Sequence, residues 1–193
     1  FFFKQKTAYE IPKRDWSSDV CSSDLGGLAR AVPQWRGRSD TETLLAGFDA
    51  WGIRGAIERS VGMFAFAVWD RERSELTLAR DRMGEKPMYY GWQGVGERAV
   101  FLFGSELKAL RAHPAFDANV SRDALALFMR HNHVPGQHCI YEGVYKLEPG
   151  CLLTVSLAQR EPKFKRYWSL AEVASEGFSR PLQGSDEELV DTL

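Results

Sequence analysis

Asp40 is the side chain whose type and position most directly suggest binding chemistry. It lies in the segment Ser39-Asp40-Thr41-Glu42, whose S-x-x-E spacing is a capping box that indicates a helix start. A carboxylate there faces unpaired N–H groups and the positive end of the helix dipole, which is a purely structural role. It is also the first candidate for a role in a functional site. The local pattern by itself favours the structural role.

A second candidate is the basic loop at residues 80–86 (RDRMGEK), in which three basic residues flank a glycine bend. Such a loop could hold an anionic ligand, although the pattern favours a loop held together by ion pairs. Ser105 and Glu106, at the end of an expected strand, could also belong to a site. We expect Ser105 to cap a helix instead.

Histidines and cysteines form the remaining candidates. His131, His133 and His138 fall close together, but their segment is rich in Pro and Gly and lacks carboxylates at ligand spacing. We therefore expect no zinc site. Cys139 and Cys151 are flanked by apolar or strand-forming residues. We expect them to be buried, inert thiols rather than nucleophiles.

The hydrophobic pattern predicts the elements that would position these residues. Apolar residues at helical spacing predict a helix from residue 40 that Gly52 can end, followed by a short helix over residues 54–59. Residues 62–70 (GMFAFAVWD) are apolar on both alternating faces, which is typical of a strand buried from above and below. Further strands are expected at residues 76–80, 88–92, 99–103 and 152–155, and further helices at residues 105–111, from Ser121 and near residue 186. The pattern predicts an α+β fold of antiparallel sheets stacked between helical layers.

The composition excludes several classes of protein. The chain has 193 residues, 44% of them hydrophobic, and carries 25 Lys and Arg against 26 Asp and Glu. A net charge of −1 provides no attraction to nucleic acid or to an anionic membrane surface. No apolar run approaches the roughly 20 residues of a membrane span. Three scattered Cys make neither a disulfide framework nor a CxxC metal site. We expect a globular protein with no nucleic-acid or membrane partner.

Residues 1–25 stand apart from the rest of the chain. KQKTAYEI and DWSSDVCSSDL resemble the translations of two sequencing-adapter segments, in order, in frame and separated by the length of a sample index. The segment has no apolar periodicity and lacks the apolar core of a signal peptide. We expect residues 1–25, Cys21 included, to be a non-native, adapter-derived segment. A disordered native N-terminus is the alternative.

The order of blocks in the remaining residues resembles one family, the glutamine-hydrolysing asparagine synthetases, in their N-terminal class II glutamine amidotransferase domain. The resemblance covers residues 35–168 and is carried by the blocks RSDTETLLAGFDAWG, VGMFAFAVWDRERSELTLARDRMGEKPMYY, FGSELKAL, VPGQHCIYEGVYKLEPGCLLTV and YW. It implies an αββα sandwich of antiparallel sheets, of the N-terminal-nucleophile type and incomplete here at its N-terminus.

The resemblance also implies a mechanism. In this family the amidotransferase half hydrolyses L-glutamine to glutamate and ammonia, with an N-terminal Cys as nucleophile and its own α-amino group as base. An Asn side chain and a Gly N–H form the oxyanion hole. Ammonia then passes to a synthetase half, where ATP and Mg²⁺ activate aspartate and asparagine forms. By resemblance, Asp40 binds the α-ammonium group of glutamine. Residues 80–86 and Ser105-Glu106 serve as scaffold and as packing along the ammonia path.

The resemblance divides the chain into an adapter-derived segment at residues 1–25, a partial amidotransferase domain at residues 26–158, and a linker with the start of the ATP-binding synthetase domain at residues 159–193. The family's nucleophile, carboxylate-binding Arg and ATP loop have no match in it. We therefore expect this chain to hold no catalytic residue, cofactor or metal and to be inactive. The parent is expected to be a cytoplasmic ATP-dependent ligase whose partners are L-glutamine and its own synthetase domain, with a homodimer among its expected forms.

Two alternatives stay open. The parent could be a related amidotransferase-synthetase with a different carboxylate acceptor, because the acceptor site belongs to the synthetase half. It could instead be a Cys-less, non-enzymatic amidotransferase-like module. Nothing in the 193 residues discriminates between these alternatives.

Overall fold

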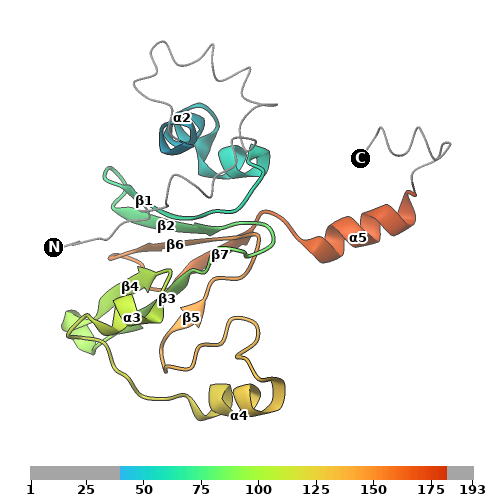
Figure 1. Cartoon of the computed structure of the whole chain (residues 1–193). Coiled ribbons are helices and arrows are strands. Elements are labelled where there is room, and N and C mark those ends of the chain that lie inside the picture. The colour runs from blue at the N-terminus through green and yellow to red at the C-terminus, as the bar shows by residue number, and fades with distance from the viewer. Residues whose placement is uncertain (1–39, 182–193) are drawn as a thin grey trace.

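The computed structural model describes residues 40–181. The expected adapter-derived segment, the Ser39 cap and the helix expected near residue 186 lie outside the described residues, as does the side chain of Asp40. Two antiparallel sheets pack face to face, and helices lie on their outer sides (Figure 1). The expected α+β class is confirmed, and the layers are consistent with an αββα sandwich.

Four strands form the first sheet, in the order β1 (Ala65–Asp70), β2 (Glu75–Arg80), β6 (Cys151–Ser156) and β7 (Lys163–Arg166). Three strands form the second, in the order β4 (Val100–Gly104), β3 (Tyr89–Gln93) and β5 (Tyr145–Lys146). All neighbours are antiparallel. The strands expected at residues 62–70 and 76–80 are confirmed and form the β1–β2 hairpin, with Ala65 opposite Arg80.

The main core lies between the two sheets. Leu78 on β2 and Leu153 on β6 are register partners, and both are fully buried. Tyr90 of the second sheet belongs to the same cluster, and Phe101 and Phe103 pack against it from β4. Burying one large apolar side chain stabilises a fold by about 1.5–3 kcal/mol, so this layer is the main source of stability.

Helix α2 (Asp40–Arg59) covers the outer face of the first sheet. Ile57 is fully buried and clusters with Phe64, and the ring of Phe48 lies 5.3 Å from that of Phe66. Gly52 interrupts the helix with φ 71° and ψ 166°, a conformation that glycine adopts without a steric penalty. The expectation of two helical segments divided at Gly52 is therefore confirmed.

The outer face of the second sheet is covered by α3 (Leu107–Arg111) and by residues 139–144. Leu110, Cys139 and Val144 form a buried cluster there. The expectation that Ser105 caps α3 is wrong. The helix begins one residue later than that role requires, so Glu106 is the N-cap residue, and its side chain makes no capping bond.

Ser121 does cap helix α4 (Arg122–His131), as the sequence predicts, because its Oγ accepts a hydrogen bond from the backbone N–H of Ala124. Asn132 ends the helix in the left-handed conformation, with φ 57°. Ala124 is the one residue of α4 that is buried.

Several elements depart from the sequence expectations. The short strand β5 and the 3-10 turn η2 (Gly96–Arg98) were not expected, and β7 follows the strand at residues 152–155 that was expected to be the last. Helix α5 (Leu170–Ser179) was also not expected; it has no buried residue and stands away from the sheets (Figure 1). No helix among residues 40–181 is long and apolar enough to cross a bilayer.

Arg80, at the end of β2, joins three parts of the chain. Its Nε donates to the carbonyl of Lys86 at 2.9 Å, its Nη1 to that of Leu147 at 2.6 Å and its Nη2 to that of Gly84 at 2.5 Å. Burial lowers the pKa of Arg80, and neighbouring Asp81 acts in the opposite direction. The guanidinium fork therefore ties the loop after β2 to the segment that leads into β6.

Asp81 holds the same loop from the other side. It is 1% exposed, and its two carboxylate oxygens accept from the N–H groups of Glu85 and Lys86 at 2.9 and 3.0 Å. The Asp81 carbonyl accepts from the N–H of Gly150 at 2.9 Å, just before β6. Arg80 and Asp81 together fix the geometry of residues 80–86.

We expect Asp81→Asn to lower the free energy of unfolding by about 2 kcal/mol, because the amide keeps the shape but loses the charge and one acceptor oxygen. Urea denaturation of the 193-residue chain measures this. Asp117→Asn is the matched control, since exposed Asp117 also accepts from a backbone N–H, that of Asn119. Its expected change is below about 0.5 kcal/mol. Equal losses in the two variants would contradict the role assigned to Asp81.

Candidate functional site

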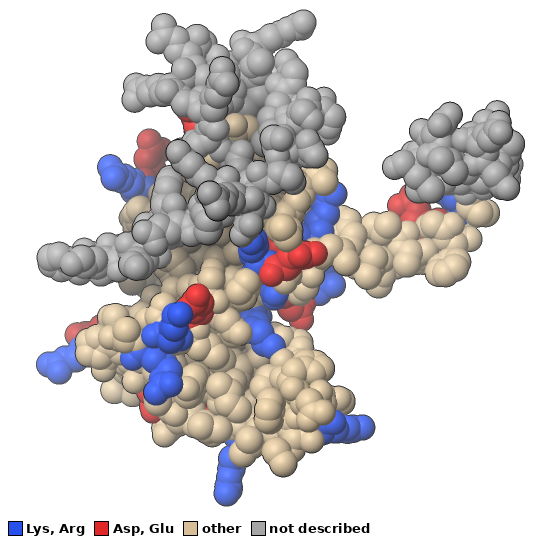
Figure 2. All heavy atoms as spheres, viewed as in Figure 1, with Lys and Arg blue, Asp and Glu red and all other residues tan. Residues whose placement is uncertain are grey.

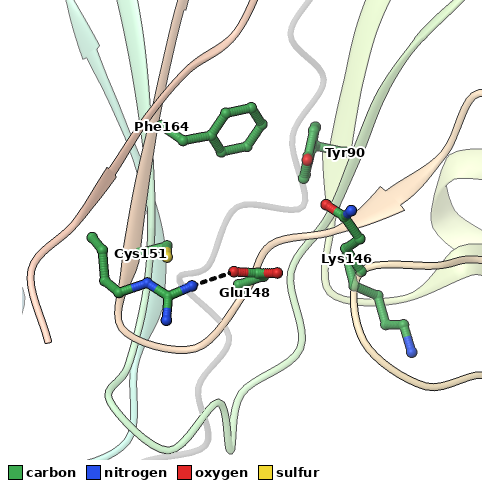
Figure 3. A pocket seen from close by; sticks show the side chains of 7 residues that line it. Tyr90, Lys146, Glu148, Cys151 and Phe164 are labelled. Atoms are coloured by element: carbon green, nitrogen blue, oxygen red, sulfur yellow. Dashed lines mark hydrogen bonds and ion pairs between the residues drawn. The ribbon is translucent and has the colours of Figure 1, made fainter. Parts of the chain in front are cut away.

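An open crevice of about 180 Å³ lies between the two sheets on the side of β5 and β7. Its lining comes from both sheets and from the segments that precede β5 and β6 (Figure 3). The lining residues are Tyr90, Gln137, Lys146, Glu148, Cys151, Phe164 and Arg166.

The strand register explains why the crevice is open. Phe164 and Arg166 are the register partners of Leu153 and Cys151, so they share the core-facing side of the first sheet. On this side, the described part of the second sheet ends at the two-residue strand β5, which lies beyond β3. As a result Phe164 remains 56% exposed although its side chain faces inward.

The crevice combines one ion pair with an aromatic wall. Arg166 Nη2 donates to Glu148 Oε2 at 2.6 Å (Figure 3). The ring centroids of Tyr90 and Phe164 lie 6.1 Å apart. Lys146 Nζ donates to the backbone carbonyl of Val134. Arg166 is thus paired with a carboxylate, and Lys146 is held by a main-chain oxygen.

Burial sets the protonation of the inner residues. It raises the pKa of Tyr90 to about 12, with smaller contributions from Tyr145, Glu148 and Cys151. It also raises the pKa of the Cys151 thiol and lowers that of Lys146. The phenol and the thiol are therefore protonated at neutral pH.

These properties suit binding better than nucleophilic catalysis. A thiolate is the reactive form of cysteine, and burial disfavours it at Cys151. No histidine is among the described residues that line the crevice, so Cys151 has no imidazole base there. The crevice presents a paired Arg and Glu, an amide and a ring face, which are groups that can hold a small polar molecule.

Asp40 is the first residue of helix α2, so its expected position at a helix start is confirmed. Its side chain lies outside the described atoms. The structure does not test its assignment to the ammonium group of glutamine, which stays a prediction. The first residues of α2 and the crevice therefore remain two separate candidate sites.

The basic loop at residues 80–86 is organised differently from the expectation. Hydrogen bonds from Arg80 to carbonyls, rather than ion pairs, hold it. Arg82 Nη2 donates to the carbonyl of Glu58 at 2.8 Å and so ties the loop to α2. Arg80 is therefore committed to the protein backbone, and the scaffold role of the loop stays a prediction.

The remaining candidates stay apart from the crevice. Ser105 and Glu106 are exposed, and Glu106 makes a surface ion pair with Lys108 at 2.7 Å. The rings of His131 and His133 lie 6.1 Å apart, but within residues 40–181 no three His, Cys, Asp or Glu side chains gather as a metal site would require. Cys139 is buried, as expected, and burial raises its thiol pKa.

Sequence reasoning missed the crevice because its residues are far apart in the chain and individually ordinary. Tyr90 and Phe164 belong to different sheets, and Arg166 lies in a strand that was not expected. The only usable signal was the apolar Phe164 between two lysines. The surface charges give no further guide, since basic and acidic side chains are interspersed on the face seen in Figure 2.

Comparisons with known proteins place this fold in a family. The glutamine amidotransferase domain family matches residues 26–168, a range that begins directly after the expected adapter-derived segment and contains both sheets and the crevice. The chain is similar to glutamine-hydrolyzing asparagine synthetase 3 of Bacillus subtilis, at 39% identity over 139 residues, which are 71% of this chain and 21% of that protein.

Two further relatives are less similar in sequence. The chain is 31% identical over 152 residues to glutamine-hydrolyzing asparagine synthetase 1 of Bacillus subtilis, covering 79% of this chain and 22% of that protein. It is 30% identical over 154 residues to amidase chry2 of Gibberella zeae, covering 78% and 21%. The chain thus spans about a fifth of the length of each. It belongs to the glutamine amidotransferase domain family, in the form found in glutamine-hydrolyzing asparagine synthetases.

Proposed function

We propose that this chain is the glutamine-binding part of an asparagine synthetase that transfers the amide nitrogen of glutamine to aspartate. The observation that carries the proposal is the family match over residues 26–168, together with similarity to proteins named as glutamine-hydrolyzing asparagine synthetases. The sheets and helices of the described residues are consistent with the αββα sandwich of N-terminal-nucleophile hydrolases, and we assign the chain to that type.

Asp40 is the residue through which glutamine would be held. It lies within the matched range and at the start of helix α2. A helix start fixes the backbone of its first residue, so a carboxylate there has a defined position. Its charge would accept from the α-ammonium group of glutamine, which is worth about 1.5–3 kcal/mol.

The synthetase chemistry would belong to another part of the parent. ATP and Mg²⁺ would activate aspartate there, and ammonia released from glutamine would reach it inside the protein. The described residues do not fit this role, because no cluster of metal-binding side chains occurs within residues 40–181. We propose that residues 159–193 contain the linker to the synthetase domain and its start, and that the linker follows β7, which still pairs with β6.

A second function is favoured by one comparison. The similarity to amidase chry2 shows that this domain also occurs in a protein that is not named as an asparagine synthetase. A parent that transfers ammonia to a different carboxylate acceptor is therefore the second candidate. Assay of the parent with aspartate and with other carboxylic acids separates the two.

We expect Asp40→Asn in the parent enzyme to raise the KM for glutamine roughly 10- to 100-fold, because the amide cannot pair with the α-ammonium charge. Ammonium-driven synthesis by the same variant should be unchanged, since it bypasses glutamine. Asp49→Asn is the matched control: Asp49 is exposed on the same helix, and its loss should leave both reactions as they are. A KM for glutamine that stays unchanged in the Asp40 variant would remove this residue from the site.

We expect the 193-residue chain itself to release no glutamate from glutamine. The proposed mechanism needs a Cys with a free α-amino group, and each of the three Cys follows another residue in the chain. Cys139 and Cys151 are buried with raised thiol pKa values. A coupled glutamate assay of the purified chain, against a Cys139→Ser/Cys151→Ser double variant as blank, tests this. Glutamate release that the double variant lacks would overturn the proposal.

A further inference from the structure

Residues 167–169 connect the end of β7 to helix α5, and we call them the exit segment. The N–H groups of Tyr167 and Trp168 both donate to the carbonyl of Gly150, at 2.8 and 3.3 Å. The Tyr167 hydroxyl donates to the carbonyl of Arg80 at 2.8 Å. The exit segment is thus held at the start of β6 through its backbone and at the end of β2 through a side chain.

Both acceptors belong to the backbone that Arg80 and Asp81 organise. Gly150 donates its own N–H to the Asp81 carbonyl at 2.9 Å while its carbonyl accepts from the exit segment. The Arg80 carbonyl belongs to the residue whose guanidinium binds three carbonyls of neighbouring segments. The exit segment is therefore bonded to backbone that other hydrogen bonds already fix in place.

Gly150 permits an unusually close approach of the exit segment. A Cβ added at this position would lie 2.3 Å from the carbonyl oxygen of Trp168, which is far inside contact distance. The φ of Gly150 is also positive, at 65°, which glycine adopts without a steric penalty. The local sequence thus provides for a tight contact between the start of β6 and the exit segment.

The ring and the hydroxyl of Tyr167 have separate roles. The ring packs against the cluster between the first sheet and α2, to which Ile57 and Leu152 belong. Burial raises the pKa of the Tyr167 phenol, so the hydroxyl keeps its proton at neutral pH and can donate it to Arg80. Replacing Tyr167 with Phe therefore removes the hydrogen bond and leaves the packing in place.

Burial ends abruptly after the exit segment. Ser169 is 8% exposed, and its Oγ caps α5 by accepting from the N–H of Glu172. Leu170, the first residue of the helix, is 57% exposed, and no residue of α5 is buried. The helix stands away from the sheets (Figure 1). Since burial gives α5 no fixed place of its own, the exit segment sets the direction in which the helix leaves the domain.

We propose that Tyr167 is a positioning residue for ammonia transfer in the parent: its hydroxyl fixes the exit segment, and through it the synthetase part that follows. This inference rests on the proposed function. The chain spans about a fifth of the length of each of three relatives, so the part to be positioned would be much larger than the segment that holds it. Tyr167 does not line the crevice. We therefore assign it to the transfer of ammonia and not to the hydrolysis of glutamine.

Tyr167→Phe in the parent enzyme tests the proposal. We expect the glutamate released per molecule of amide product to rise about twofold or more, because losing one hydrogen bond between uncharged groups shifts a local equilibrium about 2- to 10-fold. Ammonium-driven synthesis should stay unchanged, since it needs no transfer from glutamine. Tyr145→Phe is the matched control: it removes the hydroxyl of an exposed tyrosine on β5 of the second sheet and should leave the ratio unchanged.

Amide hydrogen exchange of the 193-residue chain gives a second readout that needs no activity. In the Tyr167→Phe variant, the N–H groups of residues 167 and 168 should exchange about 2- to 10-fold faster, because the segment that contains them opens more often. The N–H groups of Leu78 and Leu153, in the core between the sheets, should keep their rates. They report whether the variant loses overall stability.

The outcomes separate this inference from the proposed function. An unchanged ratio in a variant that still hydrolyses glutamine would overturn the inference alone. Equal acceleration of exchange at residues 167–168 and in the core would also overturn it, because the hydroxyl would then contribute to overall stability only. Loss of ammonium-driven synthesis would do the same, since the synthetase part itself would then need the hydroxyl. An unmodified parent that releases no glutamate from glutamine would overturn the proposed function and this inference with it.

Discussion

The path of the chain from one sheet to the other depends on a junction formed by the partly buried Arg80 and the buried Asp81. The residues after β2 must turn from one sheet toward the other, and their backbone groups lose water as they do so. The Arg80 guanidinium satisfies three carbonyls, and the Asp81 carboxylate satisfies two N–H groups. An unsatisfied buried polar group costs about 1–3 kcal/mol. Removing either side chain would leave at least two backbone groups without their hydrogen-bond partner. The Tyr167 hydroxyl donates to the Arg80 carbonyl at 2.8 Å and extends the junction beyond β7.

The same junction also lies next to segments that line the crevice. The Leu147 carbonyl that Arg80 holds lies between Lys146 and Glu148, which both line the crevice. The Asp81 carbonyl accepts a hydrogen bond from the N–H of Gly150. Gly150 directly precedes Cys151, which lines the crevice. Residues 80–86 therefore hold the backbone next to the crevice and are not among the residues that line it, which is the arrangement that the expected scaffold role requires. In this basic loop, the Arg80 guanidinium is thus occupied by carbonyls of the protein's own backbone.

The elements that could be predicted are those with many apolar side chains. Strands β2, β3, β4 and β6 and helix α2 were expected, because their pattern reports which faces are buried. Strands β5 and β7 have two and four residues, and β7 alternates one Phe with basic residues, so neither leaves a pattern. The crevice was missed for the same reason, since these two short strands contribute Lys146, Phe164 and Arg166 to its lining. The position of Asp40 at a helix start was predictable because a capping box is a local signal.

Strand β1 shows what such a pattern contains and what it omits. Alternation of apolar side chains reports the layers above and below a strand, because side chains leave the sheet perpendicular to it. The neighbours within the sheet are bound through the backbone, which has the same hydrogen-bonding groups in every residue except proline. The pattern of residues 62–70 therefore predicted correctly that both faces of the strand are packed. It did not predict how many strands pair with β1 within the sheet. What distinguishes an edge is charge: β7 has three basic residues in four, and β1 has none in six. A strand that is apolar on both faces and uncharged at its edge has the composition of a strand with two neighbours, and the described sheet gives β1 only one.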